Sequence, residues 1–265
     1  MKLIISYRNL LAMSIAIGSL CTGSTDSKAE DWPQWRGPSR DGTWKETGII
    51  DELPPGQLPY VWSTKIGPGY SGPTVALGRV YVMDRQPKER EATERIHCLD
   101  SQTGKSLWVV EYPAEYRISY TAGPRASVTV DQGKAYCVGA MGHFHCLDAL
   151  SGEVIWKKDL QKDYDIQMPI WGIAASPLIY GDLVIQQVCG SGDACMVAFN
   201  KVTGKEIWRA LKDRGAYSSP ILIGQADQDV LVCWTGDSLS GLDPKTGTVL
   251  WGHPFPPSRM PIGVG

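Results

Sequence analysis

The segment Ile96-His-Cys-Leu-Asp-Ser-Gln-Thr-Gly-Lys-Ser-Leu-Trp108 decides the fold, because its pattern occurs three more times in the chain. The later copies are Phe144-His-Cys-Leu-Asp-Ala-Leu-Ser-Gly-Glu-Val-Ile-Trp156, Met196-Val-Ala-Phe-Asn-Lys-Val-Thr-Gly-Lys-Glu-Ile-Trp208 and Leu239-Ser-Gly-Leu-Asp-Pro-Lys-Thr-Gly-Thr-Val-Leu-Trp251. Their terminal tryptophans follow one another at intervals of 48, 52 and 43 residues. A period of this size is typical of repeat proteins, in which each repeat stacks on the next.

A second short pattern keeps the same phase ahead of these segments. It reads Ser-Gly-Pro-Thr-Val at 71–75, Ala-Ser-Pro-Leu-Ile at 175–179 and Ser-Ser-Pro-Ile-Leu at 218–222, and the sequence Ala-Ser-Val-Thr-Val at 126–130 takes its place in the remaining repeat. A glycine and another short apolar run follow at 78–82, 133–137 and 181–185. Each repeat therefore predicts four short strands joined by turns, with no sustained helical period. Four-stranded antiparallel repeats of this length predict an all-β fold, a β-propeller whose blades stack around an axis.

Several polar residues recur at equivalent places in all four repeats, which favours a structural role over a catalytic one. A short side-chain oxygen accepts hydrogen bonds from turn amides, and glycine adopts the positive φ that such turns need, so these residues should close the last hairpin of each blade. The tryptophans should fill the space between neighbouring blades. The recurring set is Asp100, Gly104 and Trp108; Asp148, Gly152 and Trp156; Asn200, Gly204 and Trp208; and Asp243, Gly247 and Trp251.

The composition is that of a globular, turn-rich protein. Of 265 residues, 43% are hydrophobic and 20% charged, which excludes a disordered chain, and the 29 glycines and 18 prolines predict many turns. The formal net charge of −2 gives no electrostatic reason to expect a nucleic-acid partner.

The N-terminus has the pattern of a secretory signal peptide. Lys2 and Arg8 precede an apolar run over 10–21, and the polar stretch after it ends in Ser27-Lys28-Ala29. This arrangement predicts cleavage after Ala29, and the run is too short to span a bilayer. Cys21 raises the alternative of a lipoprotein, but the bulky Leu20 stands where a lipid-attachment signal needs a small residue. We therefore expect an exported, periplasmic or extracellular protein with no transmembrane segment.

The repeated segment resembles the tryptophan-docking motif of the pyrroloquinoline-quinone (PQQ) repeat family, which has the form small-x-Asp-x-x-Thr-Gly-x-x-x-Trp. The motif maps to 98–108, 146–156, 198–208 and 241–251, and the opening 31–42 resembles the N-terminal segment of exported quinoprotein-like propellers. The family includes quinone-dependent alcohol dehydrogenases, and also non-enzymatic scaffolds such as the propeller lipoprotein of the outer-membrane β-barrel assembly machinery. The resemblance therefore implies a propeller of seven or eight blades, and PQQ with Ca²⁺ as a cofactor if the protein is an enzyme.

Features of the quinone enzymes are missing from the sequence. It has no pair of adjacent cysteines and no Cys-x-x-Cys-His haem motif, and its only asparagines are Asn9 and Asn200. An asparagine ligand for calcium thus has almost no candidate. The first hypothesis is an exported binding or scaffold module whose partner is an envelope protein, a peptide or a saccharide. The alternative is a PQQ-dependent oxidoreductase acting on alcohols or sugars.

Propellers bind ligands at the mouth of the axial channel, beside the loops that lead into the innermost strands. Here those loops carry Tyr70, Tyr120, Arg125, Trp171 and Tyr217. We predict a shallow binding funnel in which Arg125 contacts an anion or carbonyl and Trp171 offers a stacking face. Simple packing is the alternative, since Tyr70 and Tyr217 share one repeat position.

Cysteines and histidines complete the set of candidate site residues. Cys189 and Cys195 flank a short loop and could form a disulfide in an oxidising compartment, whereas Cys98 and Cys146 are expected to be buried free thiols. His143 and His145 lie on one strand face and could form a metal-binding pair. His145 is, however, the repeat equivalent of His97, so we interpret His97 and His145 as solvated blade positions. We predict no catalytic residue and no metal site.

The predicted organisation is a signal peptide over 1–29, a lead-in segment over 30–54 and propeller repeats over 55–265. The repeats amount to about four of the expected seven or eight blades, so we expect an N-terminal fragment of a propeller that is cut inside its fifth blade.

Overall fold

The fold is described from a computed structural model, which covers residues 30–47, 52–56, 58–86, 92–118, 120 and 122–256. The predicted signal peptide and the predicted entry into a fifth blade, residues 257–265, lie outside the described residues. No helix in the described part of the chain has the length and apolar character needed to cross a bilayer.

The described chain forms four sheets, each with four antiparallel strands in chain order, which confirms the predicted all-β propeller blades. Blade 1 contains β1 (Thr74–Ala76), β2 (Arg79–Gln86), β3 (Thr93–Asp100) and β4 (Ser106–Pro113). Blade 2 contains β5 (Thr129–Asp131), β6 (Lys134–Val138), β7 (His143–Asp148) and β8 (Val154–Asp159), followed by the short helix α1 (Leu160–Tyr164). Blade 3 contains β9 (Leu178–Tyr180), β10 (Leu183–Gln187), β11 (Met196–Asn200) and β12 (Glu206–Ala210). Blade 4 contains β13 (Ile221–Gln225), β14 (Gln228–Trp234), β15 (Ser238–Leu242) and β16 (Val249–Pro254).

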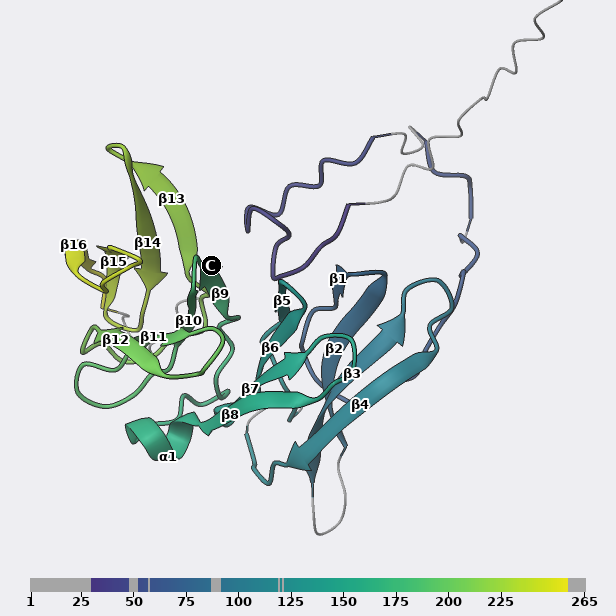
Figure 1. Cartoon of the computed structure of the whole chain (residues 1–265), viewed down its shortest axis with the longest axis horizontal. Coiled ribbons are helices and arrows are strands. Elements are labelled where there is room, and N and C mark those ends of the chain that lie inside the picture. Colours follow the sequence, from purple (N-terminus) through teal and green to yellow (C-terminus); the bar gives the residue numbers. More distant parts are fainter. Residues whose placement is uncertain are drawn as a thin grey trace, which may run out of the picture.

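The first strand of each blade is the innermost one. β5 contacts both β1 and β9, and Figure 1 shows the four sheets following one another round an arc with their first strands on its inner side. Apolar side chains fill the space between consecutive sheets in three clusters. One cluster joins blades 1 and 2, the next blades 2 and 3, and the last blades 3 and 4. The core is therefore a series of interfaces between blades, as expected where a single sheet cannot bury both of its faces.

The repeated polar residues close the last hairpin of each blade. Asp100 accepts hydrogen bonds from the backbone N–H of Thr103 (2.8 Å) and from its hydroxyl (2.7 Å), and Asp148 and Asn200 make the equivalent contacts in blades 2 and 3. In blade 4 the carboxylate of Asp243 accepts from the N–H of Lys245. Hydrogen bonds to Thr103 lower the pKa of Asp100. The glycine of each turn has a positive φ, between +67° and +78°.

Each tryptophan of the first three blades packs on the turn of the following blade. The indole of Trp108 lies over Gly152, where a Cβ would come 2.8 Å from the ring, and its Nε1 donates to the carbonyl of Ala149 at 3.2 Å. Trp156 lies in the same way over Gly204 and donates to Lys201, and Trp208 lies over Gly247 and donates to Pro244. Trp251 differs, because its Nε1 donates to Gln225 and its ring lies against Gly241 of its own blade.

Trp62 plays the same part for blade 1, although it precedes the first strand. Its ring lies directly over Gly104, where a Cβ would clash with it, and its Nε1 donates to the carbonyl of Ser101 at 2.9 Å. No Thr-Gly turn precedes Trp62, so the repeated motif does not predict its role. The interval of 46 residues to Trp108 is the signal that could have found it.

The lead-in segment lies across the inner strands of three blades. Trp32 forms a β-bridge with Val75 beside β1, and the carbonyl of Pro33 accepts from the N–H of Val130 in β5. Arg40 is buried and donates to the carbonyls of Pro177 (2.8 Å) and Ser176 (3.2 Å), just ahead of β9. We call residues 30–42 the strap.

A candidate binding pocket at the ends of the inner strands

The five residues of the predicted funnel line one pocket. Its volume is about 440 Å³, and its walls are formed by Tyr70, Tyr120, Arg125, Trp171, Ala174 and Tyr217. All six residues lie in the loops that precede the inner strands β1, β5, β9 and β13, so each blade contributes to the wall. We call this space the aromatic pocket.

The rings of the aromatic pocket contact one another in a chain. Tyr120 meets Trp171 edge-on, with centroids 5.7 Å apart, and Trp171 lies 4.9 Å from Tyr217 at an angle of 37°. The backbone N–H of Trp171 also donates to the hydroxyl of Tyr217. Tyr70 and Tyr120 remain exposed, at 56% and 73%. The pocket is therefore open, and its broad aromatic faces are accessible to solvent.

Arg125 supplies the charge of the aromatic pocket. Its guanidinium lies 5.2 Å from the centre of the Tyr70 ring and donates to the carbonyl of Gly123 at 2.5 Å. Burial lowers the pKa of Arg125, while the neighbouring tyrosine hydroxyls oppose that effect. Arginine at such a position can bind a carbonyl, hydroxyl or anion while stacking on an aromatic face.

Two buried carboxylates in blade 1 were missed by the sequence analysis. Glu94 accepts hydrogen bonds from the hydroxyls of Tyr112 (2.8 Å) and Tyr116 (2.6 Å) and from the N–H of Ala140 (3.2 Å). It therefore holds the long loop before β5 against blade 2. The local sequence does not single out Glu94, because β3 also carries the polar residues Arg95 and His97.

Asp84 is the second buried carboxylate, and it pairs with Arg95 and His97. Oδ2 of Asp84 lies 2.6 Å from Nη2 of Arg95, and its Oδ1 lies 3.0 Å from Nε2 of His97. Burial alone would raise the pKa of Asp84, but the bonds to His97, Arg95 and the Gly67 N–H outweigh it and hold that pKa far below its ordinary value. Both carboxylates have their acceptor positions satisfied internally, so they support the loops rather than face the pocket.

The interpretation of His97 and His145 as solvated positions is wrong. They are only 7% and 5% exposed. His97 contacts Asp84, and the ring of His145 lies 4.6 Å from that of Tyr112 across the interface of blades 1 and 2. Burial, with the nearby His143 and Lys157, lowers the pKa of His145 to about 4. The repeat pattern could not show this, because it places the residue on a strand face without showing what the next blade sets against it.

All six cysteines of the described residues are buried free thiols, as predicted for Cys98 and Cys146. Cys189 and Cys195 do lie beside each other at the base of the β10–β11 loop, where the N–H of Cys189 donates to the carbonyl of Cys195. No disulfide joins them in the structure. Burial raises the pKa of Cys189 to about 12, which suppresses its thiolate.

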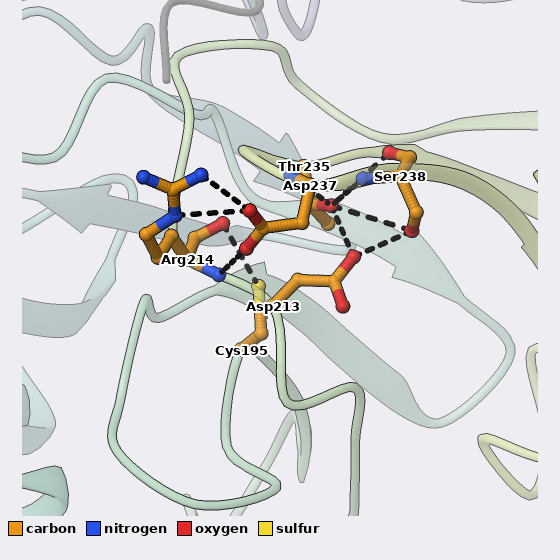
Figure 2. Close-up of polar contacts among 6 residues, drawn as sticks. All are labelled: Cys195, Asp213, Arg214, Thr235, Asp237 and Ser238. Carbon is orange, nitrogen blue, oxygen red and sulfur yellow. Dashed lines mark hydrogen bonds and ion pairs between the residues drawn. The ribbon is translucent and has the colours of Figure 1, made fainter. Parts of the chain in front are cut away.

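A second pocket adjoins the aromatic pocket between blades 3 and 4. Its volume is about 500 Å³, and Tyr217 lines both spaces. Three loops form it, at 167–170, 189–192 and 212–217. We call it the polar pocket. Figure 2 shows the side chains that hold its wall: Asp213 points toward the hydroxyls of Thr235 and Ser238, and Arg214 pairs with Asp237.

The family of the chain is shown by its sequence. Residues 92–260, more than half of the chain, match the family model described as outer membrane protein assembly factor BamB. The chain belongs to this family. No curated protein matches it.

Solved structures with the same fold include two quinohemoprotein alcohol dehydrogenases. The enzyme from Comamonas testosteroni is 16% identical with a TM-score of 0.59, and the match covers 86% of this chain and 42% of that one. The enzyme ADHIIG from Pseudomonas putida HK5 is 17% identical with a TM-score of 0.52, covering 72% of this chain and 35% of that one. The chain thus spans less than half the length of either dehydrogenase. At these identities the likeness shows the propeller fold alone.

A site for PQQ with Ca²⁺ would need flat faces for the quinone and oxygen ligands for the metal. The aromatic pocket offers flat faces for a planar ring, but none of its lining residues carries a carboxylate or side-chain amide that could bind calcium. Within the described ranges, no three His, Cys, Asp or Glu side chains are grouped so as to hold a metal ion. The described residues therefore do not fit the calcium-bound quinone.

Proposed function

We propose that this BamB-like propeller is a non-catalytic binding module of the cell envelope, and that its ligand occupies the aromatic pocket. The observation that carries the proposal is the convergence of Tyr70, Tyr120, Arg125, Trp171 and Tyr217 from four separate blades on one space. Arg125 and Trp171 do not recur at their repeat positions, so blade packing does not account for them.

The chemistry of the pocket supports binding rather than catalysis. Its six lining residues offer stacking faces and one guanidinium, but no carboxylate, imidazole or thiol that could move a proton or attack a substrate. Trp171 and Tyr217 would stack on a flat ligand, and Arg125 would donate hydrogen bonds to its polar edge.

The family and the N-terminus support the same proposal. The matching family is described as an assembly factor, which is a binding role. The signal-peptide pattern before Glu30 supports export to the envelope.

The proposal is tested by separating binding from turnover. The full chain is mixed with PQQ and Ca²⁺, and tryptophan fluorescence is followed together with dye-linked oxidation of a panel of alcohols and sugars. We expect no turnover. Oxidation that requires the added quinone would instead establish the oxidoreductase.

Binding itself is tested with the fluorescent probe 8-anilinonaphthalene-1-sulfonate, which carries aromatic rings and an anionic group. Trp171→Ala should weaken its binding by about tenfold, or about 1.4 kcal/mol. Exposed Trp44 lies outside the pocket, and Trp44→Ala should leave the affinity unchanged. Equal affinity of the Trp171→Ala variant and the native chain would refute the proposal.

A further inference from the structure

The polar pocket and the aromatic pocket are separated by one pair of stacked rings. Tyr217 lines both spaces, and Trp171, which packs on it, follows Ile170 of the polar pocket. A ligand longer than one ring can therefore pass from one space to the other over this pair. The two adjoining pockets, which share Tyr217, are together called the two-part groove.

Asp213 is held rigidly in the wall of the polar pocket. Its Oδ2 accepts hydrogen bonds from the hydroxyls of Thr235 and Ser238, both at 2.5 Å. Its Oδ1 accepts no hydrogen bond from the described residues, and Figure 2 shows this oxygen directed away from the two hydroxyls. One half of the carboxylate thus fixes the side chain and the other half is left for a donor on a ligand.

The charges around Asp213 favour a neutral ligand. Lys212, which is exposed, also lines the polar pocket, so both an ammonium and a carboxylate belong to its wall. Arg214 is paired with Asp237, since its guanidinium donates to Oδ1 at 2.5 and 2.9 Å and its N–H donates to Oδ2 at 2.7 Å. The two residues together add no net charge to the pocket, and a ligand hydroxyl can both donate to Asp213 and accept from Lys212.

The backbone around the groove argues against an extended peptide. Peptides that bind propeller or sheet proteins by strand addition need an exposed sheet edge. Every residue lining either pocket lies in a loop and none in a strand. The groove therefore offers side chains and loop amides, but no strand edge to pair with.

We propose that the two-part groove binds an oligosaccharide, with one sugar ring stacked on Trp171 and Tyr217 and the next hydrogen-bonded to Asp213. A sugar ring combines an apolar face, which suits the aromatic pocket, with a rim of hydroxyls, which suits the polar pocket. This inference rests on the proposed binding function and adds the class of ligand.

The test compares sugars of increasing length on the full chain. The probes are glucose, cellobiose and cellotriose, and N-acetylglucosamine with its β-1,4-linked dimer and trimer, measured by calorimetry and tryptophan fluorescence. We expect one trisaccharide to bind at least tenfold more tightly than its monosaccharide. Asp213→Asn, which keeps the side-chain shape, should remove most of the gain in trisaccharide affinity over monosaccharide affinity. Trp171→Ala should weaken both.

Asp193→Asn is the matched control. Asp193 is an exposed carboxylate close to the 189–192 loop but does not line the polar pocket, so its substitution should change no affinity. Near-ultraviolet circular dichroism checks that each variant is folded.

Any one of four results would overturn the inference. A trisaccharide that binds no more tightly than its monosaccharide, or an Asp213→Asn variant with native affinity, removes the second subsite. Binding of the anilinonaphthalene probe without any saccharide refutes the ligand class while the proposed function stands. If no probe perturbs Trp171, both proposals fail.

Discussion

At the residue scale, the indole of one blade and the glycine of the next form a matched pair. Trp108 can lie flat on the turn of blade 2 because Gly152 has no Cβ, and because its φ of +78° is one that glycine adopts without strain. The pair also satisfies the indole N–H, which donates to Ala149 at 3.2 Å. The same arrangement at Trp62, Trp156 and Trp208 explains why tryptophan is common here and phenylalanine rare, since phenylalanine has no donor.

Alanine substitutions at Gly152 and Gly133 distinguish the strain of a positive φ from crowding by a neighbouring indole. Gly133 also has a positive φ, +75°, but no atom lies within 4 Å of a Cβ built on it. Gly133→Ala should reduce the free energy of unfolding by about 1 kcal/mol, the cost of a left-handed residue. Gly152→Ala should cost a further 1–3 kcal/mol or so, because its Cβ would press on Trp108. Urea unfolding measures both, and equal losses would show that the contact with Trp108 is unimportant.

His145 makes stability depend on pH. Its pKa in the folded protein is lowered to about 4 from 6.5, so between these values the unfolded chain binds a proton that the folded protein does not. Stability should therefore fall as the pH drops through this window, by about 2 kcal/mol from pH 7 to pH 5. His145→Gln should flatten the dependence measured by urea unfolding, whereas the exposed His253→Gln should not. A pH profile left unchanged by His145→Gln would contradict this assignment.

The redox state of the cysteines can be read from the number of alkylation labels that they take up. All six in the described residues are buried and free, so none should react with an alkylating agent in the folded protein. After unfolding without reductant, each of the six should add one label by mass spectrometry. Two missing labels would mean that Cys189 and Cys195 are joined, because the β10–β11 loop places them side by side.

At the scale of elements, the strap connects blades that are distant in sequence. Its contacts reach Val75, Val130 and Pro177, one on or beside the inner strand of each of the first three blades. Arg40 makes the longest of these connections, 137 residues along the chain. Burial lowers the pKa of Arg40 to about 9, because the buried position disfavours the charged guanidinium. The hydrogen bonds that Arg40 donates to the two carbonyls compensate for this cost.

Removal of Arg40 should release the strap. Arg40→Ala leaves the carbonyls of Ser176 and Pro177 without this donor, and we expect a loss of about 2–3 kcal/mol in the free energy of unfolding. The region around residues 30–47 should also become the first site of limited proteolysis. The exposed Arg36, which donates to the carbonyl of Asp41, gives the control Arg36→Ala. Equal protease resistance of the two variants would show that the strap does not depend on Arg40.

At the scale of the whole molecule, the described residues cover the outer face of blade 4 less than they cover the corresponding faces of blades 1 and 2. Tyr81 and Met83 in blade 1, and Tyr136 and Val138 in blade 2, are completely buried against the next blade or nearly so. Their counterparts in blade 4 by strand register are Val232 and Trp234, which pair with Gly241 and Leu239. Val232, Trp234 and Leu239 are only partly buried, and Phe255, packed on Trp234, is 54% exposed.

This face should make the chain self-associate. Contiguous exposed apolar surface is typical of an interaction site or an aggregation hazard. We expect concentration-dependent association in sedimentation velocity, and we expect Trp234→Ser with Phe255→Ser to abolish it. Leu150 and Val202 are exposed singly in turns, so Leu150→Ser with Val202→Ser is the control. Association that persists in the first double variant would locate the contact elsewhere.

Much of the fold could be predicted because it is encoded locally. The alternation of apolar residues predicts each strand, and Asp148, Ser151 and Gly152 predict the turn that closes a blade. The five funnel residues were also found from the sequence, since their place just before an inner strand is set by the repeat phase. The pairing of Glu94 with Tyr112 and Tyr116, the burial of His145 and the path of the strap were missed. Each depends on what another segment brings to the same place.

The sequence by itself determined the repeating blade and its turns, because those contacts join residues only a few positions apart along the chain. The tertiary structure alone decided which surfaces meet: that Trp108 packs on the following blade, that Arg40 reaches Pro177, and that Tyr217 is shared by two pockets. The physical reason is the stacking of blades around an axis. It brings together equivalent loops that lie some 45–50 residues apart in the chain. No local sequence pattern identifies which side chains on those loops will contact one another.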